Sequence, residues 1–153
     1  WRDSIARAAM QTAEDNVWKH TSFELAPKLD YLCHLQLTAT NDNEIVGFCE
    51  VAVLGNPRKY APAILNLGVH NKFRRQGVGT ALLRVAERYI TLHWPQFDTI
   101  GLYVSDTNHG AKALYENAGY TLSHTGKYKS DTFQYLFKTL QTAVPAAAER
   151  VLR

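Results

Sequence analysis

The spacing of hydrophobic residues along the chain predicts a sheet with helices packed on it. Apolar and polar residues alternate over three stretches of the first half, as in half-buried β-strands. In the second half two segments carry apolar residues three or four positions apart, as amphipathic helices do. A weaker helical pattern covers residues 4–19, ahead of the first strand.

The expected elements are strands at 31–40, 44–54 and 64–69, a helix at 81–92, a strand at 99–104, a helix at 108–118, and a closing hairpin of strands at 120–124 and 133–140. Asn41-Asp42-Asn43 provides the turn between the first two strands. The order is β-β-β-α-β-α-β-β after N-terminal helices, which predicts a mixed α/β (α+β) fold.

A glycine-containing segment lies where the third strand is followed by the first long helix. It reads Arg74-Arg75-Gln76-Gly77-Val78-Gly79-Thr80. Glycines let the backbone approach a ligand closely, and a helix start presents N–H groups without helical partners. The positive end of the helix dipole and two arginines favour an anion there. We therefore expect the arginines, the N–H groups of Gln76 to Gly79 and the Thr80 hydroxyl to bind a pyrophosphate.

Two common phosphate-binding loops do not fit this segment. A dinucleotide-binding G-x-G-x-x-G would need glycine where Leu82 stands, and the Gly-Lys-Ser/Thr of a P-loop is absent from the sequence. The segment instead reads R-x-x-G-x-G, and residues 108–120 then read N-x-x-A-x-x-L-Y followed by G-Y. The two motifs, in this order, resemble the acyl-CoA loop and the next helix of GNAT-superfamily N-acetyltransferases.

This resemblance covers roughly residues 31–138 and carries several implications. It implies a GNAT-like, mostly antiparallel central sheet flanked by helices, with acetyl-CoA as co-substrate and no metal. Residues 1–153 are expected to form a single acyl-CoA-dependent N-acyltransferase domain whose motif-bearing core is 31–138. Such folds normally begin with one further strand, which is expected to be missing here.

Composition narrows the choice of partners and compartment. With 153 residues, 46% of them hydrophobic, the chain can bury a core, and a net charge of +3 is too small for a typical nucleic-acid binder. Cys33 and Cys49 lack the spacing of a zinc site or a disulfide framework, so we expect buried thiols in a reducing intracellular compartment, cytoplasmic by default. The chain begins with Trp1, so a removed leader and an organelle such as the plastid remain open. No apolar run reaches membrane-spanning length.

The resemblance assigns cofactor-binding roles outside the loop. In the family the third strand parts from the next one, and its backbone, here Leu67, Gly68 and Val69, pairs with the pantetheine arm of CoA. A backbone N–H near Val69 is the expected oxyanion donor. Gly68 itself indicates a bulge or a close ligand approach. Asn108 is expected to contact the CoA arm and to cap its helix. Lys112 is a candidate for the 3′-phosphate, a solvated lysine being the alternative.

Two side chains are candidates for proton transfer. Tyr115 is expected to protonate the departing CoA thiolate, because a phenol pKa of ~10 is close to that of a thiol; packing of the helix is the alternative. Many relatives carry a carboxylate base on the third strand, but residues 63–69 contain none. Glu50, on the neighbouring strand, is the candidate base, with a solvent-facing role equally open. Asn66 could orient a water, His70 could titrate near neutral pH, and an acceptor deprotonated in bulk water is the remaining alternative.

The acceptor is expected to be a primary amine, bound between the first helical region, the loop at 55–62 and the hairpin around 127–129. Residues 47–53, 65–69 and 74–79 are somewhat similar to plastid and cyanobacterial protein acetyltransferases, which favours a protein lysine or an N-terminal amine. A small-molecule amine and a non-catalytic acyl-CoA sensor are the alternatives. We expect no nucleic-acid or membrane partner, and a monomer or homodimer.

Overall fold

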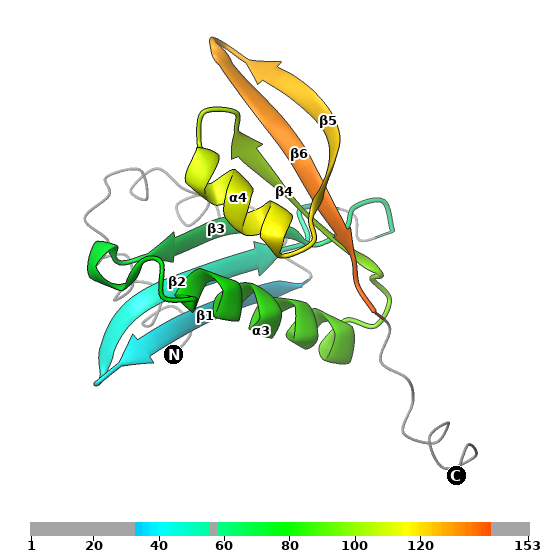
Figure 1. The fold of residues 1–153 in the computed structure, drawn as a ribbon. Helices are drawn as coiled ribbons and strands as arrows, with labels where there is room; N and C mark the ends of the chain where they lie inside the picture. Colours follow the sequence, from blue (N-terminus) through cyan, green and yellow to red (C-terminus); the bar gives the residue numbers. More distant parts are fainter. Residues whose placement is uncertain (1–32, 56–57, 142–153) are drawn as a thin grey trace.

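The computed structural model describes residues 33–55 and 58–141 (Figure 1). Its elements are β1 (His34–Asn41), β2 (Glu44–Ala52), β3 (Ala63–Val69), the 3₁₀ turn η3 (Asn71–Phe73), α3 (Val78–His93), β4 (Thr99–Ser105), α4 (His109–Asn117), β5 (Thr121–Tyr128) and β6 (Asp131–Thr139). The six strands form one sheet in the order β1-β2-β3-β4-β6-β5, antiparallel except for the β3–β4 pair. The predicted order of elements from the first strand onward and the mixed, mostly antiparallel sheet are confirmed. The expected helix at 4–19 lies outside the described residues.

The largest differences between predicted and observed element boundaries occur at α3 and β5. The helix α3 begins at Val78 rather than at residue 81, because Gly77 adopts a left-handed conformation (φ 84°) that turns the chain into the helix. The strand β5 continues to Tyr128, well beyond the expected end at His124. Every residue of β5 is exposed, so the strand carries no apolar alternation from which its length could be predicted.

The sheet has two distinct faces. Helices α3 and α4 cover one of them, here called the helix face (Figure 1). The core lies between this face and the helices; among its fully buried side chains are Val51, Leu83, Ile90, Ile100, Leu102 and Leu136. Residues that alternate with the core positions, such as Phe48, Glu50 and Tyr103, belong to the opposite face.

The sheet divides into two halves, β1-β2-β3 and β4-β6-β5, that share little pairing. β3 and β4 pair only at Ala63↔Gly101 and Ile64↔Leu102 and diverge beyond these positions. On the helix side, Glu87 of α3 accepts hydrogen bonds from the Tyr120 hydroxyl (3.0 Å) and from Lys138 Nζ of β6 (2.7 Å). These contacts tie the helix that packs on the first half to the strands of the second.

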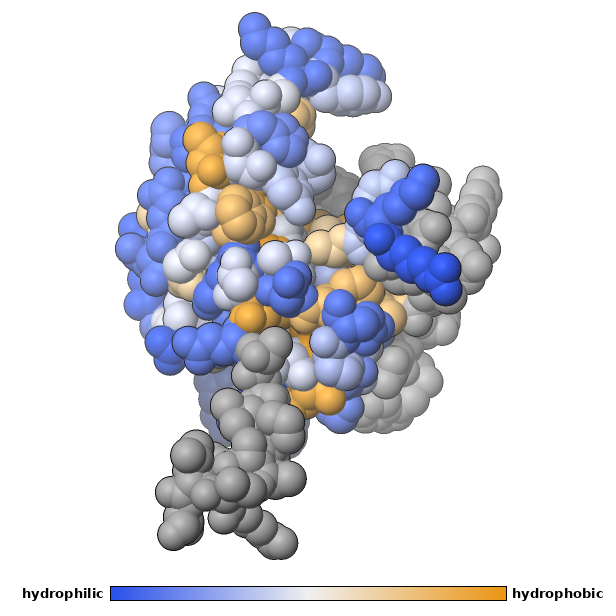
Figure 2. Space-filling view, turned by 90° about the vertical axis from the view of Figure 1, so that its right-hand side faces the viewer, coloured by the Kyte–Doolittle hydropathy of each residue, from blue (hydrophilic) through white to orange (hydrophobic). Residues whose placement is uncertain are grey.

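The outer surface is polar over the tip of the β5–β6 hairpin, at the top of Figure 2, whereas hydrophobic side chains gather lower on that face. Within the described ranges neither helix is long and apolar enough to cross a membrane.

Candidate active site

A cleft opens where β3 and β4 diverge. Its volume is about 910 Å³, and its walls come from β2, β3, the segment before α3, the first turn of α3, and α4. The cause of the divergence is local: Leu65 is an extra residue in β3, between the pairs Ile64↔Val51 and Asn66↔Glu50. Such a β-bulge bends its strand. Because the bulge directly follows the last β3–β4 pair, it turns the rest of β3 away from β4.

The free edge of β3 presents backbone groups to the cleft. His70 N–H donates to Val46 O of β2 at 2.7 Å, and hydrogen-bonding positions alternate along an antiparallel strand. The N–H and C=O groups of Leu67 and Val69 therefore point away from β2, toward the gap. The Val69 carbonyl accepts a hydrogen bond from Arg74 Nε (2.9 Å), which holds the arginine at the end of the strand.

The segment 74–80 forms the turn that the sequence predicts at the start of α3. Arg75 (φ 62°) and Gly77 (φ 84°) both adopt left-handed conformations, so the backbone changes direction sharply at each of them. Arg74, Arg75 and residues 77–80 line the cleft. Gln76 does not: its side-chain amide donates to the Lys72 carbonyl at 3.1 Å. The N-terminus of α3 thus faces the cleft with two arginines beside it, an arrangement that suits an anion.

Gly79 allows α3 and α4 to approach each other. A Cβ atom at this position would lie 3.2 Å from Leu114 Cδ2 and 3.7 Å from Val69 Cγ2. The residue is buried within the first turn of α3. Its small size therefore serves helix packing as well as access of a ligand to the backbone.

Gly68 lies opposite the ring of Phe48 and not at a bulge. It pairs regularly with Phe48, and a Cβ at Gly68 would lie 2.7 Å from Phe48 Cε1. The bulge falls at Leu65 instead of Gly68. The missing side chain of Gly68 makes room for the Phe48 ring on the opposite face, while both residues line the cleft.

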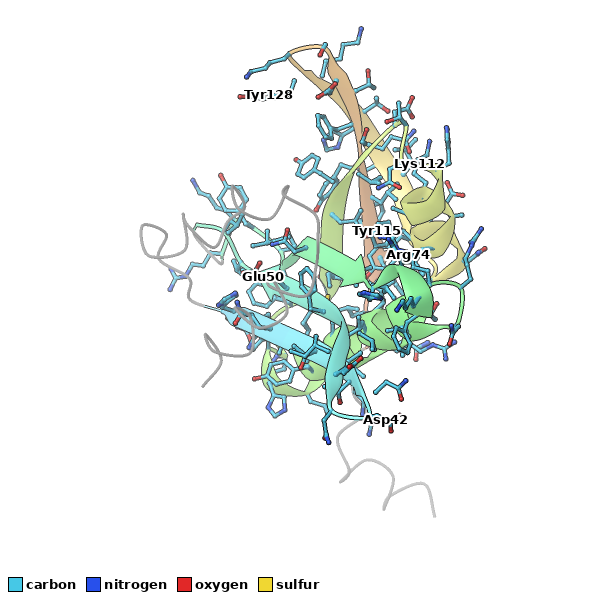
Figure 3. All side chains as sticks on the ribbon, turned by 90° about the vertical axis from the view of Figure 1, so that its left-hand side faces the viewer. Asp42, Glu50, Arg74, Lys112, Tyr115 and Tyr128 are labelled. Carbon is cyan, nitrogen blue, oxygen red and sulfur yellow. The ribbon has the colours of Figure 1, made fainter. Side chains whose placement is uncertain are left out.

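Two residues of α4 have clear positions. Asn108 caps the helix, its side-chain oxygen accepting from Ala111 N–H at 3.2 Å, and it lines the cleft. Lys112 is not among the lining residues. Its ammonium lies 3.1 Å from Asp106 Oδ1, which also accepts from Gln134 Nε2 at 2.9 Å. The structure thus places Lys112 in a local ion pair outside the cleft lining; Figure 3 labels it.

Tyr115 lies between the cleft and the core. It is 7% exposed, and its ring contacts that of Tyr120 edge-on at a centroid distance of 5.8 Å. Burial, with a smaller contribution from the neighbouring Cys49, raises the pKa of Tyr115 well above its usual value. The phenol therefore stays protonated at neutral pH and is a weaker acid than the sequence suggested.

Glu50 lies on the opposite face of the sheet from Tyr115 and Arg74 (Figure 3). It is 5% exposed, so it is not solvent-facing. Its carboxylate lies 2.8 Å from His34 Nε2 and accepts from Asn66 Nδ2 at 2.5 Å. A carboxylate held by side chains of both neighbouring strands has a fixed orientation, as a base requires.

His34 was missed by the sequence analysis. The signal for it is visible only with the strand register: Gln36, Glu50 and Asn66 face one another across β1, β2 and β3, and His34 precedes this row on the same face. The side-chain oxygen of Gln36 is buried and has no hydrogen-bond partner among residues 33–55 and 58–141. Each strand contributes only one residue to this polar row, and in the sequence of one strand such a residue looks like any polar position of an alternating pattern.

Both cysteines are free thiols, Cys49 buried and Cys33 half-buried. In the described part of the chain, no three His, Cys, Asp or Glu side chains gather closely enough to hold a metal ion.

Comparison with known proteins places these features in a family. Residues 2–120 match the model of the Acetyltransferase (GNAT) family. The L-amino acid N-acetyltransferase AaaT of Escherichia coli is 30% identical over 92 residues, which are 60% of this chain and 56% of that protein. The match thus spans little more than half of the relative's length.

Solved structures share the fold at low sequence identity. The ribosomal-protein-S18-alanine N-acetyltransferase of E. coli has a TM-score of 0.63 at 19% identity, covering 80% of this chain and 79% of that one. An aminoglycoside 6′-N-acetyltransferase complexed with coenzyme A has a TM-score of 0.64 at 17% identity, covering 80% and 82%.

Proposed function

Because the chain belongs to the GNAT family of acetyltransferases, we propose that it transfers the acetyl group of acetyl-CoA to a primary amine by direct attack in a ternary complex. The observation that carries the proposal is the cleft between β3 and β4. It brings together the N-terminus of α3 with its two arginines, the edge of β3 that does not pair with β4, and residues of both sheet faces.

In the proposed complex the cofactor follows the cleft. Its pyrophosphate lies at residues 74–80, where Arg74, Arg75 and the α3 N-terminus supply positive charge. Its pantetheine arm lies along the edge of β3, beside the backbone groups of Leu67 and Val69. The Val69 N–H donates to the thioester carbonyl oxygen and stabilises the negative charge that develops on it.

The two proton transfers are proposed to occur on opposite sides of the sheet. The amine nitrogen forms a bond to the acetyl carbon, and its proton passes to Glu50, directly or through a water. The carbon–sulfur bond then breaks, and the thiolate leaves beside Tyr115, whose protonated phenol donates a hydrogen bond and a proton to it. Glu50 and Tyr115 lie on opposite faces of the sheet, so that each serves a different partner, the amine or the thiolate (Figure 3).

We propose an α-amine as acceptor, either of a free amino acid or of the first residue of a peptide. The support is the similarity to the L-amino acid N-acetyltransferase AaaT of E. coli. This choice retains the N-terminal amine expected from the sequence and ranks the lysine side chain below it.

The test measures CoA release from acetyl-CoA with amino acids, N-terminal peptides and lysine peptides as acceptors. We expect amine-dependent release, and a loss of kcat of roughly 100-fold in Glu50→Gln with an unchanged thermal shift by acetyl-CoA. Glu44→Gln, an exposed glutamate at the start of the same strand, is the matched control. A thermal shift without release on any amine would mean a binding domain without turnover, and the absence of both would refute the cofactor assignment.

A further inference from the structure

Three rings gather on the opposite face of the β4-β6-β5 half. Tyr103 of β4 and His124 of β5 are both register partners of Tyr135 of β6. The centroid distances are 4.8 Å for Tyr103–Tyr135 and 5.2 Å for His124–Tyr135, the latter pair stacked at 28°. We call these three residues the aromatic platform. It is separate from the core, which lies on the helix face.

The platform is accessible and its position is fixed by a glycine. Tyr103 is 66% exposed, His124 is exposed and Tyr135 is half-buried. A Cβ at Gly101 would clash with the hydroxyl of Tyr135, so the Tyr135 side chain lies directly over Gly101. Gly101 pairs with Ala63 of β3, where the two halves of the sheet still meet. The platform therefore begins at the point from which the cleft opens.

The platform and Glu50 lie on the same face of the sheet, on either side of the place where β3 and β4 part, although neither lines the cleft itself. Tyr103 directly follows Leu102, the last β4 residue that pairs with β3. Glu50 and its partner Asn66 lie on the same face, on the β2–β3 side of the gap. An amine that approaches the gap from this face thus has a carboxylate on one side and aromatic rings on the other.

We infer that the aromatic platform binds an aromatic ring of the acceptor, next to its primary amine. The inference rests on the proposed function and names its substrate class: an aromatic amino acid, or a peptide whose first residue is aromatic. Aromatic rings prefer offset or edge-on contact with other rings, and the platform offers Tyr103 for such contact.

The experiment compares acceptors that differ only in aromaticity. Rates are measured with L-phenylalanine against L-cyclohexylalanine, and with peptides beginning with either residue. We expect kcat/KM to be higher for the phenyl member. Tyr103→Ala should lower kcat/KM for that member about 2- to 12-fold through its KM, while leaving KM for acetyl-CoA unchanged. Tyr103→Phe, which keeps the ring, should retain the preference.

Leu122→Ala is the control, because Leu122 is similarly exposed on β5 (54%) but is not part of the platform. A higher kcat/KM for the phenyl member supports the proposed role of the platform. The set in which it is seen, free amino acids, peptides or both, shows which kind of acceptor the platform binds. Equal rates for phenyl and cyclohexyl acceptors in both sets would overturn it. So would a loss in Tyr128→Ala, at the hairpin tip, without one in Tyr103→Ala. Failure of the proposed function is distinguishable, since no acceptor of any kind would then release CoA.

Discussion

The proposed cofactor site and the proposed acceptor site are built from different kinds of groups. The proposed cofactor site uses the continuous segment 74–80 and one side of α4, and much of what it presents is backbone. The proposed acceptor site uses single side chains of different strands, among them His34, Glu50 and Tyr103. A site made from backbone depends on glycine and on helix geometry, which leave a motif in the sequence. A site made from scattered side chains leaves none.

The strongest test of the proposed cofactor site is Gly79→Glu. The Cβ atom of the new side chain would lie 3.2 Å from Leu114 Cδ2, and its carboxylate would bring negative charge to the proposed phosphate site. We expect the thermal shift by acetyl-CoA to disappear. Gly126→Glu is the control, since that position has open space and lies outside the cleft. An acetyl-CoA shift preserved in Gly79→Glu would place the cofactor elsewhere.

Tyr115→Phe tests whether the helix face takes part in chemistry as well as in binding. The phenol is buried and protonated, so its proposed role is that of a donor to the thiolate. We expect kcat to fall roughly 100-fold, with KM for acetyl-CoA nearly unchanged. The measurement is steady-state CoA release, with a melting curve to show that the variant folds. A full rate in this variant would reduce Tyr115 to a packing residue.

Cys49 gives the smallest effect, on stability. Burial, then the charge of Glu50, raises the pKa of this thiol from about 9 to about 12. Above pH 9 an unfolded thiol ionises while the folded one stays neutral, so its contribution is complete below pH 9 and is lost as the pH rises toward 12. In Cys49→Ala the free energy of unfolding should fall less steeply in this window, by up to about 1.4 kcal/mol per pH unit. Denaturant titrations at pH 8 and pH 10.5 measure it, and equal slopes in both proteins would contradict it.

The sequence predicted the family and most of the sheet because the relevant signals are local. The motifs at 74–80 and 108–120 indicated the GNAT family, which is confirmed. The order of strands and helices along the chain followed from the spacing of apolar residues. The position of the bulge at Leu65, and the reason for Gly68, could not be predicted, because both depend on which residue of β2 lies opposite. The ion pair of Lys112 with Asp106 likewise required the path of the loop before α4.

Glu50 shows the same limit for chemistry. Its residue type and strand could be read from the sequence, but its burial and its bonds to His34 and Asn66 need the register of three strands. The aromatic platform was not anticipated at all, since its rings come from strands whose pairing is set by the fold.

The brief contact between β3 and β4 makes the sheet discontinuous. The pantetheine arm of acetyl-CoA, lying along the edge of β3, would fill the gap where β3 and β4 do not pair. The substrate would then act as a temporary structural element, and its departure after each turnover would return the protein to two half-sheets joined at one end. Catalysis and the continuity of the sheet would thus follow the same cycle.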